Sequence, residues 1–362
     1  MRKAMLLVSA FAVVALPAMP ALAQQGVYAE GSDIIVTARQ RDETLLEVPV
    51  AVNAIGGEEL SRLSMTDTRD LAKMAPSLSI GSSMSGAGAV ISLRGIGTSP
   101  SNSGFEQAVS VNIDGMQTGR ARVVSLGLLD VAQVQVMKGP QALFFGKNSP
   151  AGVISITSAN PTRELTGYAK AGYEFVADEA IVEGVVSGPL SDSFGARVAV
   201  RYRNMDGWLH NTAGQLTSSP FAGPNHLPVA PKTSRPGEKE FMGRLTLSFE
   251  PVGSPFDATL KVAGLAHEDD GPAAGQQLFS CGAFQNPVVS YSGNPVIAVD
   301  PFGDCKFDNK YSRGGLPTGY ADHWPLAKQY PYTKLNMVLA SLQANYSADD
   351  FNITSVSGLF HS

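Results

Sequence analysis

Apolar and polar residues alternate with a period of two along most of the second half of the chain, where no helical period appears. Seven segments of strand length carry this pattern: residues 165–176, 180–190, 194–208, 239–250, 256–270, 334–347 and 351–362. In the third segment, Val198, Val200 and Tyr202 alternate with a row that contains three arginines. The pattern predicts strands with one apolar and one charged face, which suits strands of about 9–11 residues that cross a bilayer at a tilt. A soluble β-sandwich would alternate in the same way, so the alternation alone leaves both classes open.

The links between these segments differ in length according to the end of the strands at which they fall. The links after the second, fourth and sixth segments are short, with the sequences SDS, PVGSP and ADD. The links after the third and fifth segments run over residues 209–238 and 271–333. Loops longer than about 15 residues are uncommon in compact domains, and both of these lie at the same end. Short turns at one end and long loops at the other favour an outer-membrane barrel, although the first link, ADE, is short on the long-loop side.

Residues 45–160 have a different pattern, which predicts one mixed domain of helices and strands with an ordinary domain size. Two short helices are expected at 56–63 and 67–75, and Asp67 is placed to cap the second. Strands are expected at 48–55, 89–97, 109–116, 131–137 and 151–158. The third of these strands runs into Asp114 and Gly115, a pair that favours a tight hairpin turn.

The stretch QVMKGPQALFFGKNSPAGVISI, residues 135–156, begins like a phosphate-binding loop, but its spacing argues against a nucleotide site. Such a loop needs four residues between its first glycine and the Gly-Lys pair, and then Ser or Thr. Here six residues separate Gly139 from Gly146, and Asn148 follows Lys147. The glycines and Pro140 are therefore interpreted as turn residues between two strands, and Lys147 as a loop charge.

The first 23 residues have the features of a secretory signal peptide, namely a basic start, an apolar core and an Ala-Leu-Ala cleavage pattern. The remaining chain carries 25 Lys and Arg against 32 Asp and Glu, a net charge of −7 that argues against a nucleic-acid partner. Cys281 and Cys305 are the only cysteines; in an exported chain we expect one disulfide between them, with metal binding the weaker alternative. Histidines are few and scattered, so the sequence predicts no metal site and no cofactor. It also lacks a convergent set of nucleophile, base and oxyanion donors, which argues against an enzyme.

Four motifs, in this order, resemble those of TonB-dependent outer-membrane receptors. DIIVTA resembles the TonB box and consists of Asp33, Ile34, Ile35, Val36, Thr37 and Ala38. The other three resemble motifs of the plug domain. They are ISLRGIG, with Arg94 and Gly95; NIDGMQTGR, with Asp114 and Gly115; and the segment 135–156, with Lys138, Gly139, Pro140 and Gly146. Because barrel-like strands follow, the resemblance covers nearly all of the chain after the signal peptide.

The resemblance implies an α+β plug domain followed by antiparallel strands of a transmembrane β-barrel, which has 22 strands in receptors of this kind. The implied segments are a signal peptide at 1–23, a periplasmic tail with the TonB box at 24–44, the plug at 45–160 and the first seven or so barrel strands at 161–362. Seven strands would be an incomplete portion of that barrel. We therefore expect a truncated or split reading frame that would not transport by itself.

The resemblance also implies TonB-dependent active import of a scarce nutrient across the outer membrane of a Gram-negative bacterium, with a ferric siderophore as the commonest substrate class. The implied partners of this monomeric receptor are the TonB energy-transducing protein of the inner membrane, outer-membrane lipid and the nutrient. Because the nutrient is moved and no bond in it is broken, the implied activity is transport and not catalysis. The alternative is a non-conducting receptor module in the same membrane that binds or signals.

Some residues receive specific roles from the resemblance. Candidate ligand contacts at the plug apices are Ser99, Asn102, Gln117, Arg120 and Arg122. Arg94 is expected to make an ion pair between plug and barrel. Gln135 and Lys138 stand where the family has Glu and Arg, so a thinner ion-pair network is expected there. An aromatic girdle is expected from Tyr168, Tyr173, Phe175, Tyr202 and Trp208.

Overall fold

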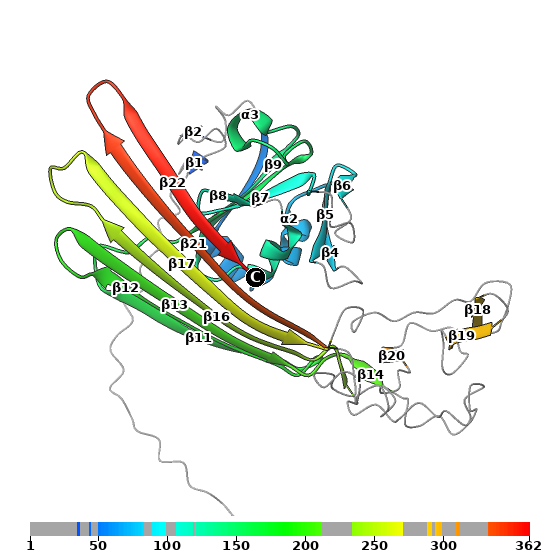
Figure 1. Cartoon of the computed structure of the whole chain (residues 1–362). Coiled ribbons are helices and arrows are strands. Elements are labelled where there is room, and N and C mark those ends of the chain that lie inside the picture. The colour runs from blue at the N-terminus through cyan, green and yellow to red at the C-terminus, as the bar shows by residue number, and fades with distance from the viewer. Residues whose placement is uncertain are drawn as a thin grey trace, which may run out of the picture.

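The protein is described by a computed structural model, which shows a small mixed domain beside a curved antiparallel sheet (Figure 1). The described residues are 35–36, 43–44, 50–82, 88–98, 106–118, 120–211, 234–270, 288–291, 294–298, 309–311 and 332–362. Within these residues, no helix is both long and apolar enough to span a membrane.

The curved sheet has seven strands in chain order, and every neighbouring pair is antiparallel. The strands are β11 (Thr166–Glu174), β12 (Glu179–Pro189), β13 (Phe194–Met205), β16 (Glu238–Phe249), β17 (Phe256–Asp269), β21 (Thr333–Ser347) and β22 (Asn352–His361). All seven strands predicted from the alternation are confirmed, with ends that differ by a few residues. The turns after β12, β16 and β21 lie together at one end of the sheet (Figure 1). The short turn between β11 and β12 lies at the opposite end, where β13 and β17 lead into the two long links.

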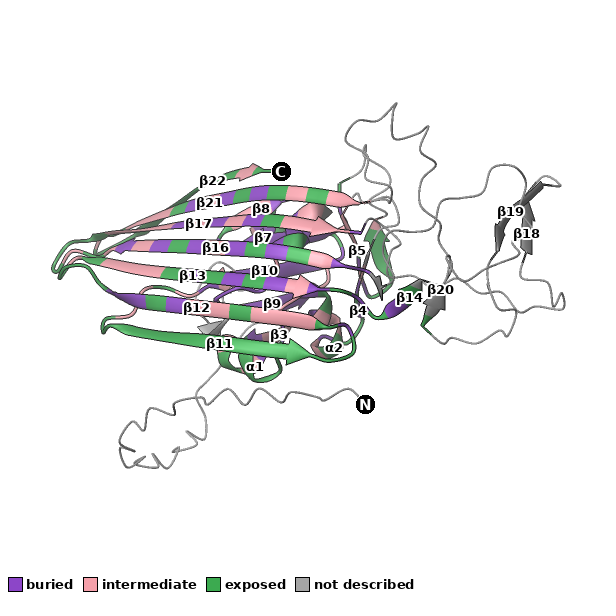
Figure 2. Ribbon diagram, turned by 90° about the horizontal axis from the view of Figure 1, so that it is seen from below, coloured by how far each residue is buried: buried purple, intermediate pink, exposed green. Residues whose placement is uncertain are grey.

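The two faces of this sheet differ in polarity as the alternation predicts. Val198, Val200 and Tyr202 are exposed on the outer face of β13, whereas Arg201 and Arg203 are buried on its inner face. Figure 2 shows buried and exposed residues alternating along β13, β16 and β21, whereas the edge strand β11 is exposed along its whole length. This arrangement fits strands with one face toward lipid and the other toward an enclosed domain.

Aromatic rings gather on the outer face near the short turns. Phe194 and Phe249 lie with ring centroids 4.6 Å apart, and Phe256 is 6.4 Å from Phe249. Aromatic girdles of this kind mark the membrane boundary in barrels. The expectation that Tyr168 belongs to such a girdle is wrong. Tyr168 lies on the inner face, where its hydroxyl donates to Glu183 at 2.9 Å, because the strand period turns it away from the outer face.

In the described parts of the two long links there are five short strands that the sequence pattern did not predict. β14 (Leu209–Asn211) pairs with β15 (Ser234–Arg235) and, in parallel, with β20 (Lys310–Tyr311) of the other long link. β18 (Val288–Tyr291) and β19 (Asn294–Ala298) form a separate hairpin. Strands this short show no period, so alternation cannot reveal them.

The small domain is built on a mixed five-stranded sheet with the order β3-β9-β10-β7-β8. Its strands are β3 (Ala51–Gly56), β7 (Val109–Ile113), β8 (Met116–Thr118), β9 (Val131–Lys138) and β10 (Gly152–Ser158). A second sheet contains β4 (Leu78–Ser82), β5 (Ala89–Leu93) and β6 (Ile96–Thr98). Before these strands in the chain, the two-residue strands β1 (Ile35–Val36) and β2 (Glu43–Thr44) pair with each other.

Short helices connect these strands. They are α1 (Gly57–Arg62), η1 (Thr68–Asp70), α2 (Leu71–Met74), η2 (Ala121–Leu126) and α3 (Ala142–Phe145). The helix expected at 67–75 is divided into the 3₁₀ turn η1 and one turn of α-helix. Asp67 caps it as predicted, because its carboxylate accepts a hydrogen bond of 2.7 Å from the N–H of Arg69.

Two of the motifs singled out in the sequence are tight turns. Asp114 and Gly115 have φ values of 50° and 81° between β7 and β8. Arg94 and Gly95, with φ values of 53° and 80°, join β5 to β6, so the strand expected at 89–97 is a hairpin. Two successive positive φ values are typical of type I′ turns, whose second position favours glycine.

Candidate functional site

The curved seven-stranded sheet is called the wall from here on. The small domain packs on the inner face of the wall. One buried apolar cluster contains residues of both, with Ile113, Leu128 and Leu129 from the small domain and Ala199, Met242 and Leu265 from the wall. Polar groups of the wall reach across the same interface at several heights. The contact between the two bodies is therefore the candidate functional site.

The Asp114 turn is fixed on both of its sides. Within the small domain, the Asp114 carboxylate accepts hydrogen bonds from the N–H and the hydroxyl of Ser158, at 2.8 and 2.7 Å. From the wall, Lys261 Nζ donates to the same carboxylate at 3.0 Å and to the Ser158 carbonyl at 2.8 Å. Ser341 of the next strand donates its hydroxyl to the Asp114 carbonyl at 2.7 Å. A turn residue thus serves as a buried anchor to two wall strands.

A second anchor joins Asp130 to Arg197 of β13. The guanidinium donates from Nε and Nη2 to the two carboxylate oxygens, at 2.7 and 2.6 Å. Both side chains are largely buried, and Asp130 has a positive φ of 53°. A bidentate pair out of water is among the stronger and more directional polar contacts.

Arg244 of β16 is buried at the same interface, and among the described residues it has no carboxylate partner. Its Nη1 donates to the main-chain carbonyls of Leu129, at 2.6 Å, and of Asp130, at 3.4 Å. Only 5% of the residue is exposed. Carbonyl dipoles compensate a buried charge less fully than an ion does, so this guanidinium is left with a net positive field.

Nearer the long links, the wall pairs its charges internally. Arg201 donates to Glu240 at 3.0 Å, and Arg203 contacts both Glu238 and, at 3.7 Å, Glu179. His267 lies 3.1 Å from Asp269. All of these residues belong to β12, β13, β16 and β17. This end of the wall is acidic, with its carboxylates beside basic groups of the same sheet.

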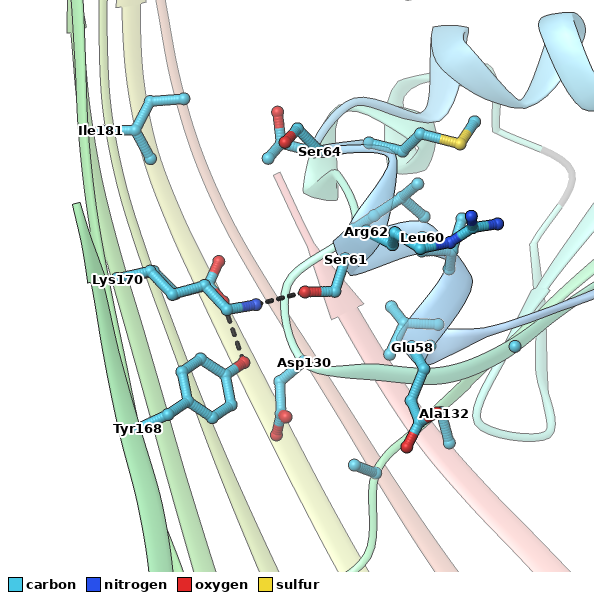
Figure 3. A pocket seen from close by; sticks show the side chains of 18 of the residues that line it. Glu58, Leu60, Ser61, Arg62, Ser64, Asp130, Ala132, Tyr168, Lys170 and Ile181 are labelled. Carbon is cyan, nitrogen blue, oxygen red and sulfur yellow. Dashed lines mark hydrogen bonds between the residues drawn. The ribbon is translucent and has the colours of Figure 1, made fainter. Parts of the chain in front are cut away.

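A cavity of about 1190 Å³ opens between α1 and the first three strands of the wall. Figure 3 shows Lys170 reaching across it to the hydroxyl of Ser61, with Tyr168 directly below. The ammonium group of Lys170 also lies 4.5 Å from the centroid of the Tyr168 ring. Around this cavity the small domain and the wall are joined by the exposed Lys170–Ser61 contact and by the Asp130–Arg197 pair, which also lines the cavity.

The residues expected in the plug motif lie around the turns described above, but not all in the expected role. Arg94 is exposed, and the described part of the chain offers it no ion pair, so the expected plug-to-wall pair is not found there. The pairs that cross the interface have the opposite polarity, with Asp114 and Asp130 on the small domain and cations on the wall. Sequence reasoning missed Asp130, although an acid directly before a strand and an arginine row on the wall were its visible signals.

The rest of the segment 135–156 behaves as a connection between β9 and β10. Gly139, Gly146 and Gly152 have positive φ values of 94°, 65° and 151°, and α3 lies between them. Lys147 is exposed and pairs with Glu106 at 2.8 Å, as expected of a loop charge. The Gln135 side chain is buried and donates to Gln133 at 2.6 Å. Lys138 is partly buried, and no ion pair of this side chain occurs within the described ranges.

The structure covers the remaining predicted residues only in part. Gln117 donates to the Lys147 carbonyl at 2.6 Å, Arg120 is exposed and Arg122 is partly buried. Outside the described residues lie Asp33, Ile34, Thr37, Ala38, Ser99, Asn102, Cys281 and Cys305. Of the expected TonB box, Ile35 and Val36 are described, as strand β1.

Comparison with known proteins agrees with this architecture. Residues 44–153 match the family model of the TonB-dependent receptor plug domain. The pesticin receptor of Yersinia pestis is 28% identical over 176 residues, which are 48% of this chain and 26% of that receptor. The vitamin B12 transporter BtuB of Vibrio vulnificus is 27% identical over 183 residues, which are 49% of this chain and 28% of that transporter. The chain thus spans about a quarter of the length of these curated relatives.

Among solved structures, the ferric yersiniabactin uptake receptor FyuA from Yersinia pestis superposes with a TM-score of 0.62 at 20% identity. The superposition covers 85% of this chain and 40% of that receptor. The small domain is therefore a TonB-dependent receptor plug, and the fold is that of a plug domain with antiparallel strands of the receptor barrel. The resemblance to TonB-dependent receptors expected from the sequence is confirmed.

Proposed function

We propose that this chain supplies the plug domain and barrel strands of a receptor for TonB-dependent active import across the outer membrane. The observation that carries the proposal is the seating of the plug on the inner face of the wall. Buried pairs at Asp114 with Lys261 and at Asp130 with Arg197 hold it there. A domain bound inside the curve of outward-apolar strands would close the lumen that such strands surround.

The proposed segments are a signal peptide at 1–23, a periplasmic tail at 24–44, the plug at 45–160 and barrel strands at 161–362. The proposed substrate is a ferric siderophore, supported by the likeness to a ferric yersiniabactin uptake receptor. The receptor would bind it at the extracellular loops and plug apices, near Ser99, Asn102, Gln117, Arg120 and Arg122. Import moves the chelate without breaking its bonds, so the proposed activity is not enzymatic.

The proposed partner on the inner side is the TonB protein, which would capture residues 33–38 by strand addition. Pairing of Ile35 and Val36 with the Glu43–Thr44 strand supports the ability of this segment to adopt an extended conformation. The receptor would be a monomer, with its apolar outer face in lipid.

Deletion of Asp33–Ala38 in a receptor that contains this chain tests the proposal. Cells are given iron-55 complexes of several siderophores, and surface binding and uptake are measured separately. We expect uptake to fall to background while surface binding of the imported complex stays unchanged. A second deletion of the same length in the preceding segment, residues 27–32, should leave uptake intact. Normal uptake in the first deletion would refute the role of this segment, and binding without uptake in the intact receptor would favour a non-conducting module.

A further inference from the structure

Charge on the inner face of the wall is sorted along the barrel axis. The strand register places Arg197, Thr246 and Lys261 in one row near the short turns, and Arg244 stands in the next row. At the opposite end, Glu238 and Asp269 share a row that also contains Glu179, on the far side of Met205. The two rows nearest the plug contacts thus carry three cations, with Asp257 of β17 closer still to the short turns, and acids outnumber bases in the long-loop half.

The two halves also differ in where their partners come from. The acids at the long-loop end lie beside Arg203 and His267 of the wall itself. In contrast, every hydrogen-bond or ion-pair partner of Arg197, Arg244 and Lys261 within the described residues belongs to the plug. Movement of the plug would therefore leave these three cations without a partner. The acids at the long-loop end would still lie beside the basic groups of the wall.

Thr246 lies in the register between Arg197 and Lys261. It is fully buried, and its hydroxyl has no hydrogen-bond partner within the described residues. A buried hydroxyl without a partner is uncommon, because it loses its hydration without compensation. The row therefore contains three hydrogen-bond donors that a ligand could use. Among the described residues the Thr246 hydroxyl is already without a partner, and Arg197 and Lys261 would lose theirs if the plug moved.

We propose that Arg197, Arg244 and Lys261, with Thr246, form a transit site for an anionic group of the substrate. The carboxylates of Asp114 and Asp130 occupy this site in the closed receptor and are exchanged for a carboxylate or similar oxyanion of the passing chelate when the plug moves. Exchange of one oxyanion for another avoids leaving buried cations without a counter-charge, which is strongly unfavourable. The inference rests on the proposed import function and narrows its substrate to anionic chelates.

Charged thiol reagents can test this site. A receptor that contains this chain, in outer-membrane vesicles and carrying Thr246→Cys, is treated with sulfonatoethyl or trimethylammonioethyl methanethiosulfonate, with and without urea to release the plug. In urea we expect the anionic reagent to react about tenfold faster than the cationic one, because a cationic surface concentrates anions. Without urea both should react slowly. Ser248→Cys, on the same face of β16, repeats the measurement if Thr246→Cys folds poorly.

Substitution of the cations supplies the control. Lys261→Gln or Arg197→Gln should lower the ratio of the two rates by about threefold each. Lys239→Gln, on the outer face of β16, should leave it unchanged. Equal rates, a faster cationic reagent, or no reaction of either reagent in urea would overturn the proposal. Because vesicles in urea need neither TonB nor import, a failure here is distinguishable from a failure of the uptake test.

Discussion

At the scale of single residues, Asp130 combines a left-handed backbone with a bidentate ion pair to the wall. Few side chains tolerate that backbone, and aspartate and asparagine are among those that do. The position therefore allows the carboxylate to be removed without changing the backbone. A substitution at Asp130 can therefore test the contribution of its charge to plug seating while the backbone geometry stays the same.

Asp130→Asn should weaken plug seating by about 3 kcal/mol, because it leaves the largely buried Arg197 guanidinium without its counter-charge. Hydrogen exchange of the η2 and β9 amides in detergent-solubilised protein would measure the loss. Asp70→Asn is the matched control, since its pair with Lys73 is exposed and contributes little to stability. Equal protection in the two variants would contradict the anchoring role of Asp130.

The Asp67 cap predicts a dependence on acid pH. Burial raises the pKa of Asp67, but the hydrogen bonds and charge of Arg69 outweigh it, and the pKa lies below its usual value. A depressed carboxyl pKa contributes stability that is fully present above the unfolded pKa of about 4 and is lost as the pH falls through the folded pKa.

Asp67→Ala should therefore lower the free energy of unfolding by about 1 kcal/mol at pH 6, and by progressively less as the pH falls below about 4. Urea midpoints of the variant and the unsubstituted protein, measured at pH 6 and below about pH 4, would show the loss of stability at each pH. Asp70→Ala provides the comparison, because the Asp70 side chain makes no cap hydrogen bond. A difference that is independent of pH would show that the charge of Asp67 contributes nothing.

At the scale of elements, the sequence predicted the strands that carry a repeating pattern of apolar and polar residues. It did not predict individual features that no repeating pattern marks. Alternation over many residues predicted all seven wall strands, and glycine turns predicted the connection between β9 and β10. The hairpin at Arg94 was missed because its two strands together read as one apolar run. The ion pair between Asp130 and Arg197 could not be predicted, since it depends on how the plug packs against the wall.

The outer face of β13 allows the membrane assignment to be tested. Val200→Lys should cost about 2–4 kcal/mol, because Val200 lies in the middle of an apolar face that we place in lipid. Asn204→Lys, on the same face but near the long-loop end, should cost less than about 1 kcal/mol. Folding into lipid vesicles, followed by the heat-dependent shift in gel mobility, would compare the two. Equal effects would argue against a lipid-facing surface.

At the scale of the whole molecule, the plug and β22 approach closely enough to be joined covalently. A Cβ built on Gly115 would lie 3.8 Å from the Val356 Cβ, a spacing that suits a disulfide. Gly115→Cys with Val356→Cys should therefore lock the plug to the wall, with some backbone strain at the positive φ of Gly115. We expect import to stop in the oxidised protein and to recover on reduction. Each single substitution is the control, and import by the cross-linked protein would show that this edge of the plug need not move.

The pairing of β14 with β20 has a consequence for engineering. Each strand lies in a different long link, and they meet in one small sheet, where the N–H of His210 donates to the Asn309 carbonyl at 2.7 Å. The two links therefore do not behave as separable modules. A chimaera that takes a single loop from a relative would leave an orphaned strand edge, so binding specificity would have to be grafted as a pair of loops and would be inherited as a pair as well.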